Sequence, residues 1–169
     1  MVSFSSILFI ISSLYFSFKS EKSLIASSLS NPFYERFAES MEVDKENWLK
    51  TKCPVCGFKP SVSYIADSQE VEGGRFLRCV LCNTDWLYNR NRCVNCGNED
   101  DKEMDYYYQE ENRAVQLQVC QKCGHYIKLI DMRLDGLAVP HVEDVATLIL
   151  DLWAKERGFV KFENNIFDL

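Results

Sequence analysis

The stretch that decides the fold reads Cys53-Pro-Val-Cys-Gly57, and a near copy, Cys93-Val-Asn-Cys-Gly97, follows 40 residues later. Each stretch is followed by a second Cys-x-x-Cys pair, so all eight cysteines fall into four pairs. The second pairs lie 41 residues apart and are Cys79/Cys82 and Cys120/Cys123. The chain therefore holds two tandem copies of one unit, which differ in length by a single inserted residue.

The cysteine pairs indicate metal sites rather than disulfides. Four disulfides would suit a secreted protein, but a bridge across two intervening residues closes only a very small loop, whereas two such sulfurs readily bind one ion. Iron–sulfur clusters are disfavoured because their cysteines usually crowd into one short run. We expect tetrathiolate sites in a reducing compartment, each formed by the two ends of one unit. The predicted metal ligands are Cys53, Cys56, Cys79 and Cys82 for one ion, and Cys93, Cys96, Cys120 and Cys123 for the other.

The residue after each pair supports this prediction. Gly57, Gly97 and Gly124 follow three of the pairs, and glycine adopts the positive φ that ends such a loop. Asn83 follows the fourth pair, and asparagine tolerates a positive φ better than most other residues.

Alternating and β-branched residues predict three strands in each copy. The expected strands are residues 62–66, 75–78, 86–88, 106–109, 114–119 and 126–130. The predicted fold class is α+β, with two tandem rubredoxin- or zinc-ribbon-like four-cysteine units at residues 51–92 and 93–131. Residues 1–50 would form a short helical N-terminal region, and residues 132–169 a C-terminal helix and tail that pack on the ribbons.

The N-terminal region opens with an apolar run from Phe4 to Phe18 that is interspersed with serine. The run is shorter than a membrane span, which needs about 20 strongly apolar residues, and no Lys or Arg precedes it as in a signal peptide. We expect a buried helix, with a cleaved signal or a membrane anchor as the alternatives.

A helix is also expected over residues 32–41, with Asn31 as its N-cap and Pro32 at its first helical position. Phe33, Phe37 and Met41 would line one face of this helix.

The tail has the clearest helical period in the chain, and Gly158 follows it as the stop. The face expected to pack on the ribbon units or the N-terminal helices consists of Val142, Val145, Ala146, Ile149, Leu152 and Trp153, widened by Leu148 and Leu150.

The net charge and the sequence motifs limit the classes of function expected for this chain. The net charge is −6, and two divalent ions held by eight thiolates would bring it to roughly −10, which disfavours a nucleic-acid binder. Full tetrathiolate sites leave no position for a substrate, and neither His125 nor His141 lies in a catalytic pattern. The chain is therefore not expected to be an enzyme. A cluster of arginines near the first unit is interpreted as a solvated or partner-facing patch. Its members are Arg75, Arg78, Arg90 and Arg92.

Several stretches together resemble one family. They are Cys53-Pro-Val-Cys-Gly57, Gly74-Arg-Phe-Leu-Arg-Cys-Val-Leu-Cys82, Cys120-Gln-Lys-Cys-Gly-His-Tyr-Ile-Lys128 and Glu143-Asp-Val-Ala-Thr-Leu-Ile-Leu-Asp151. Over about residues 52–169 the chain is similar to the FdhE-type formate dehydrogenase accessory proteins. Members carry a larger helical domain ahead of the cysteines than the roughly 50 residues present here.

The resemblance implies a cytoplasmic biogenesis factor that binds and helps mature the catalytic subunit of formate dehydrogenase. It also implies rubredoxin-like sites that bind iron, so iron competes with zinc for the two sites. Neither nucleic acid nor membrane is expected as a partner. The alternatives are a zinc-ribbon nucleic-acid-binding module and a rubredoxin-like electron carrier.

Overall fold

The computed structural model describes residues 23–165, with side chains from residue 31 onward. The expectation for the run from Phe4 to Phe18 lies outside this range. The helices are α2 (Ser23–Glu39), α3 (Pro140–Ala146), α4 (Leu148–Glu156) and the short 3₁₀ helix η1 (Asp101–Glu103). The strands are β1 (Pro60–Ala66), β2 (Gly74–Cys79), β3 (Asp85–Tyr88), β4 (Met104–Gln109), β5 (Asn112–Cys120), β6 (His125–Asp131) and β7 (Val160–Lys161). The six strands predicted from the sequence are confirmed, and with them the α+β class.

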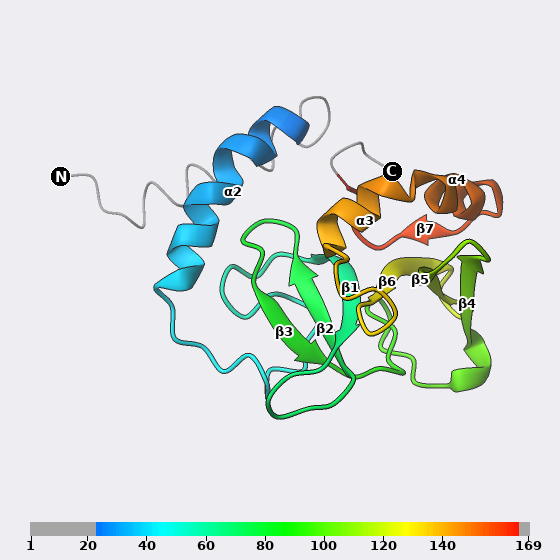
Figure 1. Cartoon of the computed structure of the whole chain (residues 1–169), viewed down its shortest axis with the longest axis horizontal. Coiled ribbons are helices and arrows are strands. Elements are labelled where there is room, and N and C mark those ends of the chain that lie inside the picture. The colour runs from blue at the N-terminus through cyan, green and yellow to red at the C-terminus, as the bar shows by residue number, and fades with distance from the viewer. Residues whose placement is uncertain (1–22, 166–169) are drawn as a thin grey trace.

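One sheet joins the two cysteine units, with strand order β3-β2-β1-β6-β5-β4 and β7 beside β6 (Figure 1). Within each unit consecutive strands are antiparallel. The units meet where β1 runs parallel to β6, with Val62 opposite Lys128 and Ile65 opposite Asp131. The first strand of one unit thus pairs with the last strand of the other, and the two copies stand head to tail.

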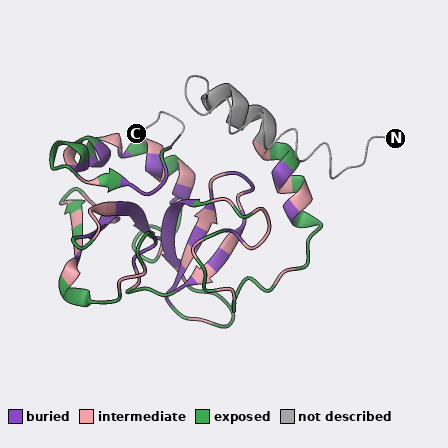
Figure 2. Ribbon diagram, turned by 180° about the vertical axis from the view of Figure 1, so that it is seen from behind, coloured by how far each residue is buried: buried purple, intermediate pink, exposed green. Residues whose placement is uncertain are grey.

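Burial is greatest at this junction. Six of the seven residues of β1 and six of the seven of β6 are buried, as the central strands in Figure 2 show. One apolar cluster surrounds the first cysteine group and includes Leu77 and Trp86. A second cluster joins the sheet to α4 and includes Val62, Leu117 and Leu150. The central strands therefore give both cysteine units a common rigid base.

Helix α2 differs from the helix predicted near Pro32. It begins at Ser23, so Pro32 lies inside it and Asn31 is not its N-cap. A proline removes one hydrogen bond from a helix, and here packing on the first unit outweighs that loss. Tyr34 and Ala38 enter the core, whereas Phe33 is 68% exposed. The predicted apolar face was therefore wrong.

The single C-terminal helix expected from the sequence is two helices, α3 and α4, separated at Thr147. Gly158 follows with φ of 80°, as predicted for the stop. The face turned toward the sheet differs in part from the predicted one. Val142, Ile149 and Leu152 are exposed, whereas Trp153 packs against the second cluster as predicted, and the inner side also includes Asp144 and Asp151.

A buried cluster of charges explains both differences. Lys128 Nζ lies 2.7 Å from Asp151 Oδ2 and 3.3 Å from Asp144 Oδ1, and Lys161 Nζ lies 2.7 Å from Asp144 Oδ1. The Lys128 ammonium also donates to the carbonyl oxygens of Asp144 and Thr147, at 2.5 and 3.1 Å. In a continuous helix the Asp144 carbonyl would bond the amide four residues on. The lysine therefore satisfies carbonyls that the break releases, and it holds the acidic face against the sheet.

Candidate metal centres

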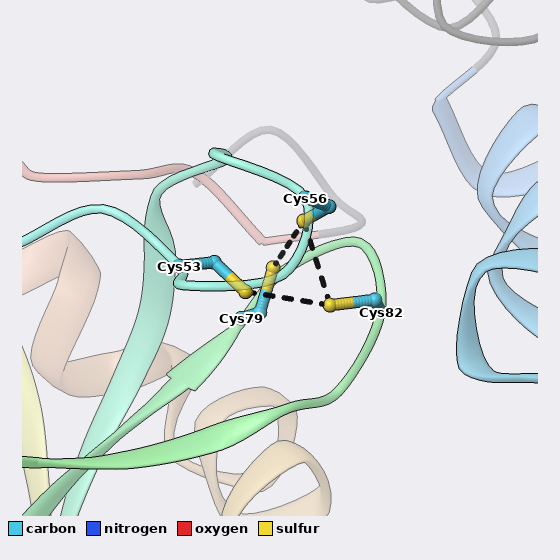
Figure 3. A group of neighbouring side chains, drawn as sticks. All are labelled: Cys53, Cys56, Cys79 and Cys82. Carbon is cyan, nitrogen blue, oxygen red and sulfur yellow. Dashed lines mark hydrogen bonds between the residues drawn. The ribbon is translucent and has the colours of Figure 1, made fainter. Parts of the chain in front are cut away.

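The first cysteine group is drawn from two loops of the first unit (Figure 3). Cys53 and Cys56 precede β1, Cys79 ends β2, and Cys82 follows it. The sulfur of Cys56 lies 3.3 Å from that of Cys79 and 3.4 Å from that of Cys82, and Cys53 lies 3.5 Å from Cys82. All four sulfurs lie within 4.8 Å of one another.

The second group repeats this arrangement in the second unit, with Cys93 and Cys96 ahead of β4 and Cys120 and Cys123 around the end of β5. The sulfurs of Cys93 and Cys123, and those of Cys96 and Cys120, are 3.7 Å apart. This group is more accessible than the first, because Cys96 is exposed.

The geometry suits a tetrahedral ion. Zinc–sulfur bonds of about 2.3 Å in a tetrahedron separate the sulfurs by about 3.8 Å. All eight cysteines are free thiols. The structure thus brings together the two sets of four residues that the spacing grouped, and among the described residues no third group of His, Cys, Asp and Glu side chains comes as close.

The loops take the conformation that the following residues predicted. Gly57, Asn83, Gly97 and Gly124 have φ of 75°, 51°, 71° and 68°. The turn directs backbone amides at the sulfurs, since the amide of the second residue after Cys53, Cys79 and Cys93 donates to that cysteine's sulfur at 3.4 Å. Such amides stabilise thiolates, the form that binds metal.

Without an ion the crowded sulfurs shift one another's pKa values in opposite directions, so the thiols of one group do not all ionise together. The pKa values of the Cys56 and Cys79 thiols are raised, above all by the neighbouring sulfur of Cys53, whose own pKa is lowered by hydrogen bonds from Cys56 and Cys79. In the second group, burial raises the pKa of Cys93 to about 12. Four thiolates therefore need a cation among them before all can be charged.

Some contacts of the sites were not predicted from the sequence. The Thr84 hydroxyl lies 3.1 Å from the Cys82 sulfur. The His125 ring bonds the Cys123 carbonyl through Nδ1 at 2.9 Å, and the His141 ring bonds the Asn83 side chain. The surface reading of the arginines was wrong for Arg75, which is 1% exposed. Nothing in the local sequence distinguishes Arg75 from Arg78 and Arg92, which are partly exposed, or from Arg90, which is exposed.

Among residues 23–165, none of the helices has both the length and the apolar character that a membrane crossing requires.

Comparisons with known proteins match both units to one family. Residues 52–90 match the model "FdhE, central domain", and residues 91–167 match "FdhE, C-terminal domain". A protein FdhE homolog of Aquifex aeolicus (strain VF5) is 53% identical over 138 residues, which are 82% of this chain and 49% of that protein. A protein FdhE homolog of Enterobacter sp. (strain 638) is 36% identical over 68% of this chain and 37% of its own length. The chain thus spans half or less of the length of these relatives.

A solved structure gives the same result. The crystal structure of the FdhE protein from Pseudomonas aeruginosa superposes with a TM-score of 0.74 at 26% identity, over 85% of this chain and 50% of that one. Since models of one family cover both cysteine units, and since the relatives and the solved structure carry the same family name, the chain belongs to the FdhE family.

Proposed function

We propose that this chain acts in the maturation of formate dehydrogenase, by binding the enzyme's catalytic subunit in the cytoplasm, and that it holds two metal ions. The observation that carries the proposal is the pairing of FdhE family membership with eight cysteines gathered into two four-sulfur groups. In this function the chain is a binding protein and not an enzyme.

In this proposal each group binds one iron or zinc ion. Cys53, Cys56, Cys79 and Cys82 hold the first ion, and Cys93, Cys96, Cys120 and Cys123 hold the second. Sulfur separations of 3.3 to 3.7 Å and amides directed at the sulfurs support tetrahedral coordination. Four protein ligands fill the coordination sphere, so an ion here stabilises structure or exchanges electrons and does not activate water.

The ions would hold the two units, residues 51–92 and 93–131, in shape for the partner. A structural zinc ion contributes on the order of 10–16 kcal/mol in small domains. Each group joins the loop ahead of a unit's first strand to the end of its second strand. Loss of an ion therefore frees both loops of that unit, and any partner surface that includes them.

The test is affinity purification of the tagged chain from its native host under anaerobic, reducing conditions. The proposal predicts recovery of the formate dehydrogenase catalytic subunit by the native chain, and weaker recovery by a Cys53→Ser/Cys93→Ser variant at equal expression. Cells that lack the catalytic subunit give the background for the tag. Recovery of RNA polymerase or ribosomal components in its place would contradict the proposal and favour a nucleic-acid module.

A second candidate, an electron carrier, is favoured by the accessibility of the second centre. Cys96 is exposed and Cys123 is partly exposed, so an iron ion there would lie close to the surface, where electrons exchange readily. Anaerobically purified protein separates the two functions. A red protein that bleaches reversibly on reduction supports the carrier, and a colourless zinc protein eliminates it.

A further inference from the structure

Arg75 is a buried cation without a carboxylate partner. It lies on β2, opposite Ile65 of β1 and Tyr88 of β3, and only 1% of its surface is exposed. No acidic side chain in the described part of the chain forms an ion pair with it, and its Nε and Nη2 atoms have no hydrogen-bond partner. Burial lowers the pKa of its guanidinium to about 10, so Arg75 is still charged at neutral pH.

The one hydrogen-bonded nitrogen of the Arg75 guanidinium faces the linker between the two units, residues 89–92. Nη1 donates to the carbonyl oxygens of Asn89, Arg90 and Arg92, at 3.2, 3.2 and 3.0 Å. The residue after Arg92 is Cys93, the first cysteine of the second group, and it is buried. An arginine of the first unit thus lies one peptide unit from a predicted ligand of the second.

The second unit fixes the same linker from the other side. The Gln118 side chain, on β5, donates to the Arg90 carbonyl at 3.2 Å and to the Tyr106 hydroxyl at 3.0 Å. The linker is therefore held between β2 and β5, and the guanidinium has a fixed place relative to the second group.

A buried charge is costly unless an opposite charge lies near it. The Tyr88 ring lies 5.5 Å from the Arg75 guanidinium, but an aromatic ring supplies no net negative charge. Cys93 follows the Arg92 carbonyl that Arg75 binds, and it becomes a thiolate when it binds a metal ion. A divalent ion with four thiolates has a net charge of about −2, which is the counter-charge that the guanidinium lacks.

We propose that Arg75 is the fixed counter-charge of the second metal centre, so that a residue of the first unit sets how tightly the second unit holds its ion. The inference rests on the metal binding proposed above. If the ion is iron, the same positive charge favours the more negative ferrous form and raises the centre's reduction potential.

Three variants of the full chain test the proposal. Arg75→Gln keeps hydrogen-bond donors and removes the charge, Arg75→Lys keeps the charge, and Arg90→Gln removes a charge from an exposed side chain of the linker, where solvent screens it. Each zinc-loaded protein is titrated with a chelator, exposed thiols are alkylated, and peptide mass spectrometry reports which cysteines have lost their ion. Circular dichroism before titration reports folding.

For Arg75→Gln the second-centre cysteines should become reactive at about 10–100-fold lower chelator concentration, the usual effect of losing an outer-shell partner. The first centre should be unchanged, and Arg75→Lys and Arg90→Gln should match the native chain. Equal weakening of both centres, no weakening, or an Arg75→Lys protein as weak as Arg75→Gln would overturn the proposal. If Arg75→Gln does not fold, a native-like second centre in Arg75→Lys supports the proposal and a weakened one refutes it. A native chain that binds no zinc would instead refute the metal sites themselves.

Discussion

Replacement of Lys128 by methionine should be among the most destabilising single changes outside the cysteines. The ammonium is fully buried, where it pairs with Asp144 and Asp151 and donates to the carbonyls of Asp144 and Thr147. Methionine fills much of the same volume but leaves two carboxylates with a single paired cation, Lys161, beside the Tyr126 hydroxyl that donates to Asp151. It also leaves the two carbonyls without this donor.

The magnitude follows from these contacts. Removing one partner of a buried ion pair lowers the free energy of unfolding by about 3–5 kcal/mol, because the other charge stays buried without compensation. We expect a loss of about 4 kcal/mol in the free energy of unfolding, which for a chain of this size lowers the melting temperature by about 8–16 °C. Urea titration of the metal-loaded protein, followed by tryptophan fluorescence, measures the loss. Trp153 of α4, one of the three tryptophans, contacts Tyr107 of β4 at 4.6 Å between ring centroids, so detachment of α4 changes its contribution to the emission.

Two further variants show whether the charge is the cause. Lys155→Met removes an exposed lysine from α4 and should leave the urea midpoint unchanged. Lys128→Met combined with Asp151→Leu removes one charge of each sign and should recover part of the loss. A Lys128→Met protein as stable as Lys155→Met, or a double variant that loses the sum of both single effects, would refute this account of α3 and α4.

Two other predictions concern the first metal centre and His141. Cys53→Ser should remove the first ion and leave the second bound, because the second group draws no ligand from the first unit. Elemental analysis of the purified protein measures the number of ions per chain. Loss of both ions would show that the units act as one cooperative block. Burial, helped by Arg78, lowers the pKa of His141 below its ordinary value of 6.5. The unfolded chain then binds the proton first, so the native protein should lose more stability than His141→Gln as the pH falls from 7.5 to 5.5. Parallel urea midpoints for the two proteins over this interval would contradict that reading.

The local structure of the sites could be predicted from the sequence because their determinants are local. The spacing of each cysteine pair, and a residue tolerant of positive φ after it, specify a loop within five residues. Even Asn83, the one non-glycine member of the set, has the expected φ of 51°. Most of the strands were recognisable from alternation or from aromatic and β-branched residues, which are also local features.

Contacts between distant residues could not be predicted in this way. The parallel pairing of β1 with β6 joins segments more than 60 residues apart. The inner face of α3 and α4 consists partly of Asp144 and Asp151, and their burial depends on lysines that lie in strands β6 and β7. A prediction from the spacing of hydrophobic residues places such acidic side chains on the solvent-facing side of the helix. Arg75 was misplaced for the same reason, because its surroundings come from the linker and from the neighbouring unit.

Native mass spectrometry of the chain, purified anaerobically and without added metal, tests the central claim most directly. The account predicts a folded protein whose mass includes two metal ions, with all eight cysteines protected from alkylation until a chelator is added. A folded, metal-free protein, whether its eight thiols are reactive or joined in disulfides, would contradict it.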